Sequence, residues 1–180
     1  MLTPLQQRKL SYLFSLDDAD KDGAVERTDF ERNADRLATS VGRAPGTPGY
    51  DQVRARYLDV WATLERRADT NRDGKVSLDE YLAAYADILA ELGAAARGFV
   101  QVLFDFADAD EDGRIAEGEY LALVGAYAVA ADAARESFRR LDRDGDGFIR
   151  QDEFLQAAED FFVSDDPNAP GTWLFGPLPA

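Results

Sequence analysis

The sequence predicts an all-α fold of about eight helices arranged around four short acidic loops. Two observations support this prediction. Apolar residues recur at three- and four-residue spacing in successive segments of the chain, which is the period of a helix that buries one face. Between these segments, one twelve-residue arrangement of acids around a glycine occurs four times. The four loops are Asp18–Asp29, Asp69–Glu80, Asp108–Glu119 and Asp142–Glu153.

About eight helical segments are expected to flank the loops, and bounds can be given for seven of them. The first covers about residues 5–17, where Leu10, Leu13 and Phe14 share one face. Residues 43–49 contain two prolines and two glycines, which break the helical pattern and predict an elongated turn before the next helix. Further helices are expected at about residues 50–68, 78–92, 95–107, 117–128, 131–141 and 151–163.

The loops share a spacing that suits a hard cation. Positions 1, 3, 5 and 12 carry side-chain oxygens, position 7 can offer its backbone carbonyl, and position 6 is always glycine, which tolerates the sharp turn required there. Calcium takes six to eight oxygens at about 2.3–2.6 Å, and this is the layout of an EF-hand calcium loop. The candidate ligands are Asp18, Asp20, Asp22, Ala24 and Asp29; Asp69, Asn71, Asp73, Lys75 and Glu80; Asp108, Asp110, Asp112, Arg114 and Glu119; and Asp142, Asp144, Asp146, Phe148 and Glu153.

Position 8 of each loop predicts how the hands pair. It is β-branched in all four loops, which favours a short strand that pairs with the equivalent strand of a neighbouring loop. An aromatic residue follows position 12 in every loop, and in three loops a phenylalanine lies four residues before position 1. We therefore expect four hands in two pairs. The position-8 residues are Val25, Val76, Ile115 and Ile149.

The four loops are not equal. The first ends in Asp29, which is one methylene shorter than glutamate and favours fewer ligands and a geometry that tolerates Mg²⁺, although Glu26 at position 9 can compensate. Ala116 at position 9 of the third loop leaves a place for water. Arg150 occupies the same position of the fourth loop, where its side chain is expected to point to solvent. We expect three or four calcium ions, with Mg²⁺ as a competitor at the first site.

Composition excludes several classes of function. The formal net charge is −15, with 35 acidic against 20 basic residues, so nucleic acid is not an expected partner. The chain has no cysteine and no histidine, which removes disulfides, zinc fingers and the usual nucleophilic triads. No segment has the roughly 20 apolar residues of a membrane span and no signal peptide is visible, so we expect a cytoplasmic protein. The preference for arginine over lysine hints at a bacterial source.

The chain divides into three parts. Residues 1–92 contain the first hand pair and residues 93–163 the second, with no polar tether between them, so we expect a compact monomer. Residues 164–180 contain prolines that prevent a continuous helix, yet Trp173, Leu174 and Phe175 are apolar. We expect this tail to cover the core, where it would occupy the groove that a target peptide needs. The alternative is a free tail that docks on a partner.

With these residues identified, the chain resembles the four-EF-hand sarcoplasmic calcium-binding proteins, especially their bacterial calerythrin-like members. The resemblance lies in residues 18–31, including aspartate at position 12 of the first loop, and in the long interval between the first and second loops. It implies a compact helical protein that binds calcium with high affinity and has no catalytic activity. Such proteins often have a degenerate second hand, whereas the second loop here is intact.

Two functions remain open on the sequence, and a third is disfavoured. A calcium buffer is favoured by the number of intact loops and by the apolar tail. A calcium sensor would recruit a target, but sensors with promiscuous grooves use methionine, and Met1 is the only one here. An enzyme is disfavoured because the loops account for the clustered acids, and a further pair such as Asp87 and Glu91 suits a solvated helix face.

Overall fold

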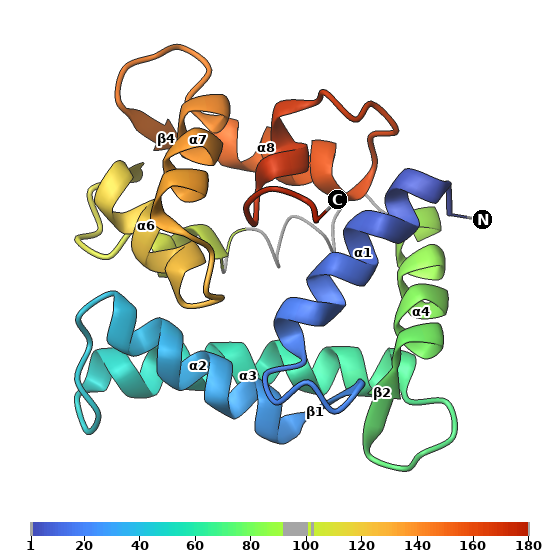
Figure 1. The fold of residues 1–180 in the computed structure, drawn as a ribbon. Coiled ribbons are helices and arrows are strands. Elements are labelled where there is room, and N and C mark those ends of the chain that lie inside the picture. Colours follow the sequence, from blue (N-terminus) through green and yellow to red (C-terminus); the bar gives the residue numbers. More distant parts are fainter. Residues whose placement is uncertain (1, 92–100, 102, 180) are drawn as a thin grey trace.

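The structure is a computed structural model that describes residues 2–91, 101 and 103–179. Its elements alternate between helices and the short strands that lie inside the loops (Figure 1). They are α1 (Pro4–Asp17), β1 (Ala24–Glu26), α2 (Arg27–Ser40), α3 (Pro48–Ala68), β2 (Lys75–Ser77), α4 (Leu78–Glu91), β3 (Arg114–Ala116), α6 (Glu117–Gly125), α7 (Ala131–Leu141), β4 (Phe148–Arg150), α8 (Gln151–Phe162) and the short 3₁₀ helix η1 (Pro170–Trp173).

The predicted fold class is confirmed, and the helices lie close to their predicted bounds. The predicted helix at 95–107 falls largely outside the described residues, although residues 103–107 are helical and lead into the third loop. No helix within the described residues is long and apolar enough to cross a membrane.

Two predicted boundaries were wrong. Pro48 and Gly49 form the first turn of α3 and do not belong to the preceding turn. Thr47 caps this helix by accepting a hydrogen bond from the backbone N–H of Tyr50, and proline is tolerated at the first helical position because its N–H is not needed there. Helix α6 ends at Gly125, before the expected residue 128, and Ala128 lies in the left-handed region with φ of 63°.

The four hands form two pairs through their loops, as position 8 predicted. Strand β1 pairs antiparallel with β2, and β3 pairs antiparallel with β4. Val25 lies opposite Val76, and Ile115 lies opposite Ile149. All four of these side chains are fully buried, so each two-stranded sheet ties a pair of loops to the core with a cross-strand apolar pair.

The two pairs share one core. Helices α2 and α3 lie side by side along one edge of the molecule, α6, α7 and α8 lie across from them, and α1 runs between the two groups (Figure 1). Helix α1 packs on α4 and also on α8, and α2 packs on α6. One continuous cluster of buried apolar side chains therefore contains residues from all four hands.

Aromatic side chains at the ends of the loops join the hands within each pair. Phe14 before the first loop packs edge to face on Tyr81 after the second, with ring centroids 5.4 Å apart. Phe104 before the third loop packs in the same way on Phe154 after the fourth, at 5.7 Å. All four rings are buried, so each aromatic pair packs the entrance of one loop against the exit of its partner loop.

The tail packs against both halves of the molecule. Helix η1 contacts α7 and α8, and Leu174 and Phe175 are buried. The hydroxyl of Tyr120 in α6 donates to the carbonyls of Trp173 and Leu174 at 3.1 and 3.0 Å, and the hydroxyl of Tyr12 in α1 donates to the carbonyl of Phe175 at 3.0 Å. The tail therefore connects α1 of the first hand to the helices of the third and fourth.

Candidate metal centres

Position 1 organises the first half of every loop. One oxygen of this aspartate accepts the N–H of position 5 at 3.0–3.2 Å, and the other accepts the N–H of the position-6 glycine at 2.9–3.1 Å. The glycine has φ between 81° and 92°, which is the left-handed conformation that only glycine adopts without strain. The loop thus curls around the first carboxylate and directs the next acids inward. The residues are Asp18 with Gly23, Asp69 with Gly74, Asp108 with Gly113, and Asp142 with Gly147.

Position 12 closes every loop. One of its oxygens accepts the N–H of position 2 at 2.8–3.2 Å, and the other accepts the N–H of position 9 at 2.8–3.0 Å. The second of these bonds also caps the exit helix, in which position 12 is the third residue. The closing acids are therefore held in place by the backbone. They are Asp29, Glu80, Glu119 and Glu153.

Hydrogen bonds keep the second loop's closing acid ionised. The backbone and hydroxyl of Ser77 donate to Glu80, and Thr70 donates as well, and together these bonds lower the pKa of Glu80 to about 2. A carboxylate that is ionised over the whole physiological range is a ready ligand for a divalent cation.

Carboxylate oxygens converge in three of the loops. Three oxygens within 4.8 Å of one another come from Asp18, Asp20 and Asp22 in the first loop, from Asp108, Asp110 and Glu119 in the third, and from Asp142, Asp144 and Glu153 in the fourth. In the second loop the amide of Asn71 takes the position-3 place, and its Oδ1 accepts the N–H of Asp73 at 2.8 Å. These donor sets consist of oxygen alone, so they fit Ca²⁺ or Mg²⁺ and not a metal that prefers nitrogen or sulfur.

The first loop differs from the third and fourth in its converging set, because Asp29 is not one of the three converging acids. The Asp29 carboxylate still bridges the N–H groups of Ala19 and Glu26, at 3.1 and 2.9 Å, and its side chain is fully buried. Burial raises the pKa of Asp29 above its usual value. Glu119 and Glu153 accept the same two backbone N–H groups and still belong to their converging sets, so the shorter reach of Asp29 leaves the first cage less complete.

Arg150 keeps 55% of its side chain exposed, as predicted, while its guanidinium turns towards the acids of its own loop. Its guanidinium forms an ion pair with Asp146 and lies 3.6 Å from a carboxylate oxygen of Asp144. The two acids at positions 3 and 5 concentrate negative charge beside position 9, and the long side chain bends back to meet it. In the third loop, Arg114 at position 7 pairs in a similar way with Asp112 at 2.8 Å.

Lys75 makes a contact between the two loops of the first pair. Its backbone N–H is bound by Asp73 of its own loop at 2.9 Å. Its ammonium lies 3.2 Å from Asp22 and 3.5 Å from Glu26 of the first loop. Occupation of one loop therefore changes the electrostatic environment of the other.

Two supporting contacts at the loop edges had no signal in the sequence. The side-chain amide of Asn33 in α2 donates to the carbonyls of Leu16 and Asp17 at 3.2 and 2.9 Å, so it fixes the end of α1. The Tyr81 hydroxyl donates to the buried carboxylate of Asp17 at 2.9 Å. Both contacts join segments that the loop spacing does not relate, and only the tertiary structure reveals them.

The left-handed backbone conformation at position 4 of each loop was also not predicted from the sequence. Lys21, Arg72 and Glu111 adopt left-handed backbone conformations with φ of 61–63°, and Gly145 takes this place in the fourth loop with φ of 71°. Non-glycine residues are uncommon in this region. The fourth loop is therefore the one that meets this requirement with glycine.

Comparison with known families identifies the second, third and fourth loops. A family model described as "EF-hand domain" matches residues 133–162, and one described as "EF hand" matches residues 66–83 and 99–123. Calerythrin from Saccharopolyspora erythraea is 27% identical over 168 residues, which cover 89% of this chain and 94% of that protein. The beta chain of a sarcoplasmic calcium-binding protein from Penaeus sp. is also 27% identical and covers 89% of this chain and 90% of its own length.

Solved structures share the whole fold. The sarcoplasmic calcium-binding protein of amphioxus superposes with a TM-score of 0.76 at 22% identity, covering 99% of this chain and all of that one. The calcium-loaded apo form of the coelenterazine-binding protein from Renilla muelleri gives 0.77 at 24% identity, with 98% and 100% covered. A Streptomyces coelicolor calcium-binding protein, described as a basis for prokaryotic calcium-mediated regulation, gives 0.73 at 25% identity, with 89% and 99% covered.

Proposed function

Because this chain is a calcium-binding EF-hand protein of the calerythrin and sarcoplasmic calcium-binding protein type, we propose that it is a calcium buffer. It binds Ca²⁺ at several sites. The proposal adds that all four loops bind, with positions 1, 3, 5, 7 and 12 of each as ligands, and that binding serves storage. The tail packed over the helices is the observation that carries this proposal.

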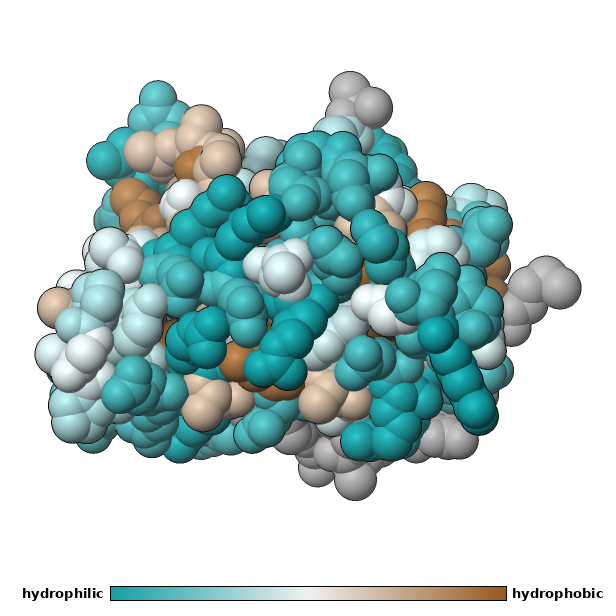
Figure 2. Space-filling model, turned by 90° about the horizontal axis from the view of Figure 1, so that it is seen from below, coloured by the Kyte–Doolittle hydropathy of each residue, from teal (hydrophilic) through white to brown (hydrophobic). Residues whose placement is uncertain are grey.

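A sensor must expose an apolar surface when it binds calcium. Here the tail covers part of α7 and α8, with Leu174 and Phe175 at 1% and 3% exposure. Among the described residues, Val163 is the one large apolar side chain that is strongly exposed, at 50%. Hydrophilic residues cover most of the face drawn in Figure 2, where the hydrophobic ones form small separate patches. A closed surface supports a buffer that works as a monomer.

The proposal excludes catalysis. The converging acids belong to the metal loops. An enclosed cavity between the hand pairs, lined by Asp17, Tyr57, Tyr85 and Tyr127 among others, has a volume of only about 30 Å³. This internal cavity has room for about two water molecules and cannot itself hold a substrate. The proposal places the protein in the cytoplasm, where high-affinity buffers of this class work.

The experiment is a calorimetric titration of the full chain with Ca²⁺, with and without Mg²⁺. The buffer is supported if four ions bind with dissociation constants of about 10⁻⁸ M and if Mg²⁺ competes, most strongly at the first loop. Dissociation constants of about 10⁻⁷–10⁻⁵ M indicate a sensor. In parallel, an environment-sensitive hydrophobic dye reports opening. A large calcium-dependent rise in its fluorescence would contradict the buffer.

Assignment of the ligands is tested by removing one closing acid. Glu119→Gln should lower the calcium count by one, because the third loop loses an anionic ligand that can bind through both oxygens. The matched control is Glu117→Gln, two residues earlier on α6, where the acid pairs with Arg135 on the surface at 3.3 Å. An unchanged count in Glu119→Gln, or an equal loss in the control, would show that the assignment is wrong.

A sensor with one dedicated partner is the second candidate. The Streptomyces coelicolor structure, described as a basis for calcium-mediated regulation, favours it because that protein shares this fold at 25% identity. If this candidate is right, calcium should release the tail. Removing residues 164–180 would then raise dye binding in the calcium-free protein to the level of the calcium-loaded full chain.

A further inference from the structure

A polar cleft separates the first hand pair from the third loop. It has a volume of about 350 Å³, at the lower end of the roughly 300–1,000 Å³ range of small-molecule sites. One wall is formed by α3 and the turn before it, and the other by the third loop and the helical residues that lead into it. Its lining residues are Arg43, Gln52, Val53, Arg56, Asp105, Phe106, Asp108, Glu111 and Gly113.

Most of the charges in this cleft are already satisfied. Arg56 forms an ion pair of 3.0 Å with Asp105, whose other oxygen accepts the side-chain amide of Gln101 at 2.7 Å. Both oxygens of Asp108 accept backbone N–H groups of its own loop, from Asp112 at 3.0 Å and Gly113 at 2.9 Å. These groups therefore already have partners within the chain.

Two lining side chains of opposite charge, Arg43 and Glu111, form no ion pair among the described residues. Arg43 lies in the turn between α2 and α3, and its guanidinium makes a single weak bond of 3.4 Å to the carbonyl of Gly49. Its stem is fixed because it packs directly over Gly49, where an added Cβ would lie 3.3 Å from Cδ of the arginine. Glu111 is exposed on the third loop. Within the part of the chain that the structure describes, neither forms an ion pair, with the other or with any residue.

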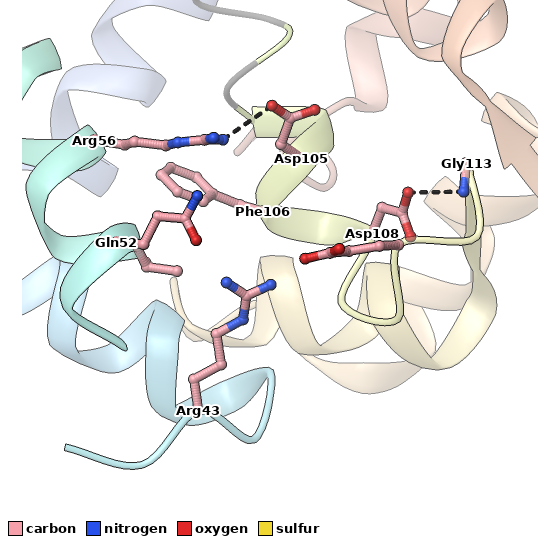
Figure 3. Close-up of a pocket in the computed structure, with 9 residues that line it drawn as sticks. Arg43, Gln52, Arg56, Asp105, Phe106, Asp108 and Gly113 are labelled. Carbon is pink, nitrogen blue, oxygen red and sulfur yellow. Dashed lines mark hydrogen bonds and ion pairs between the residues drawn. The ribbon is translucent and has the colours of Figure 1, made fainter. Parts of the chain in front are cut away.

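The cleft lies between these charges. Figure 3 shows the Arg43 guanidinium and the Gln52 amide pointing into the opening from one side, with Asp108 on the opposite wall. Val53 and Phe106 lie beneath the cleft and are 1% and 2% exposed, so the polar side chains above them supply the surface that a ligand meets. A purely anionic ligand would meet the acids of the third loop, and a purely cationic one would meet the arginines. A ligand with one charge of each sign matches both walls.

We propose that this cleft binds a free α-amino acid. Its carboxylate lies on Arg43 and its ammonium on Glu111. Guanidinium binds carboxylate through two parallel hydrogen bonds, and Gln52 can donate a further one to the same group. Because Glu111 occupies position 4 and is not a ligand position of the calcium loop, the amino acid and Ca²⁺ use different groups.

The probe is L-valine, added to the calcium-loaded full chain while backbone amide shifts are followed by nuclear magnetic resonance. We expect saturable shifts at Gly113 and Gln52 with a dissociation constant on the order of 1 mM. Two analogues keep the apolar body and remove one charge each: 3-methylbutanoate lacks the ammonium and 2-methylpropylamine lacks the carboxylate. Each should bind at least about tenfold more weakly than valine, because each loses one charge-assisted contact.

Arg43→Gln and Glu111→Gln should each weaken valine binding by about tenfold or more, with an unchanged calcium count. Arg139→Gln is the matched control, since Arg139 is 69% exposed on α7 and pairs with Glu136 away from the cleft. Equal binding of valine and 3-methylbutanoate would overturn the proposal in favour of a simple anion site. Absence of shifts at about 50 mM valine, or undiminished binding to either cleft variant, would overturn it altogether.

Discussion

The hydroxyl of Tyr81, the residue directly after the second loop, donates a hydrogen bond of 2.9 Å to the carboxylate of Asp17, the residue directly before the first loop. Tyr81 is fully buried and Asp17 is 8% exposed. Burial raises the pKa of Asp17 to about 7, and the hydrogen bond from Tyr81 partly opposes this rise. The contact links the entrance of one loop to the exit of the other through the interior.

Removing this donor should destabilise the protein. In Tyr81→Phe, the Asp17 carboxyl loses a hydrogen-bond donor while it stays buried, so we expect the free energy of unfolding to fall by about 1–3 kcal/mol. Denaturant unfolding at saturating calcium measures it. The control is Tyr50→Phe, whose hydroxyl donates to Asp35 at 2.6 Å near the surface. Since water can replace that bond, Tyr50→Phe should lower the free energy of unfolding by less. An equal decrease in both variants would contradict the role given to the buried contact.

The position of the tail depends on the close approach of Gly171 to the backbone of α8. A Cβ at this position would lie 2.0 Å from the carbonyl oxygen of Ala157 in α8 and 2.5 Å from Cβ of Asp160. Gly171→Ala should therefore displace the tail and raise binding of a hydrophobic dye in the calcium-loaded protein. Gly125→Ala, at the end of α6, has nothing within 4 Å of the added atom, so it should leave dye binding unchanged. If Gly171→Ala binds no more dye than the wild type, the tail tolerates a shift without exposing the core.

The loops could be predicted from the sequence because their requirements are local. The spacing of the acids and the position-6 glycine fix the geometry of each loop within twelve residues. The β-branched residue at position 8 predicts the paired strands, in which Val25 lies opposite Val76 and Ile115 lies opposite Ile149. Period alone also placed α7 at its observed bounds, Ala131–Leu141. Each of these features depends on residues close together in the chain, where pattern is informative.

The omissions arose where long side chains or distant segments decide the outcome. Arg150 is 55% exposed as expected, but its ion pairs with Asp144 and Asp146 were not predicted, because spacing does not report the direction of a flexible side chain. The contact between Tyr81 and Asp17 spans 64 residues. No local pattern relates two such positions, so the polar contacts that tie hand to hand became visible only in the structure.

Arg150 competes with metal in the fourth loop, and its removal should strengthen binding there. Its guanidinium pairs with Asp146 and lies 3.6 Å from Asp144, two of the acids that a cation would need. In Arg150→Gln we expect the calcium affinity of this loop to rise up to about fivefold, the range of an exposed ion pair of about 0.2–1 kcal/mol. Calorimetric titration measures it, with Arg139→Gln as a control for net charge. A gain of equal size in the control would mean that Arg150 acts through net charge alone.

Lys9 provides a pH-dependent contribution to stability. This residue is fully buried in α1, and its ammonium donates to the carbonyls of Asp160 and Ser164 at 2.9 and 2.7 Å, at the end of α8. Burial lowers the pKa of Lys9 from 10.5 to about 8, although Asp165 and Asp160 act in the opposite direction. Between about pH 8 and 10.5 the unfolded chain therefore holds this proton while the folded protein has released it.

Stability rises with pH wherever the unfolded state binds more protons. The penalty for burying the charged ammonium is thus present in full below pH 8 and is relieved as the pH rises towards 10.5. We expect the stability of the wild type relative to Lys9→Met to increase over this interval, measured by denaturant unfolding at saturating calcium. The same comparison with Arg139→Met should stay flat, because a guanidinium does not titrate there. A flat or falling curve for Lys9→Met would show that this ammonium keeps an ordinary affinity for its proton in the folded protein.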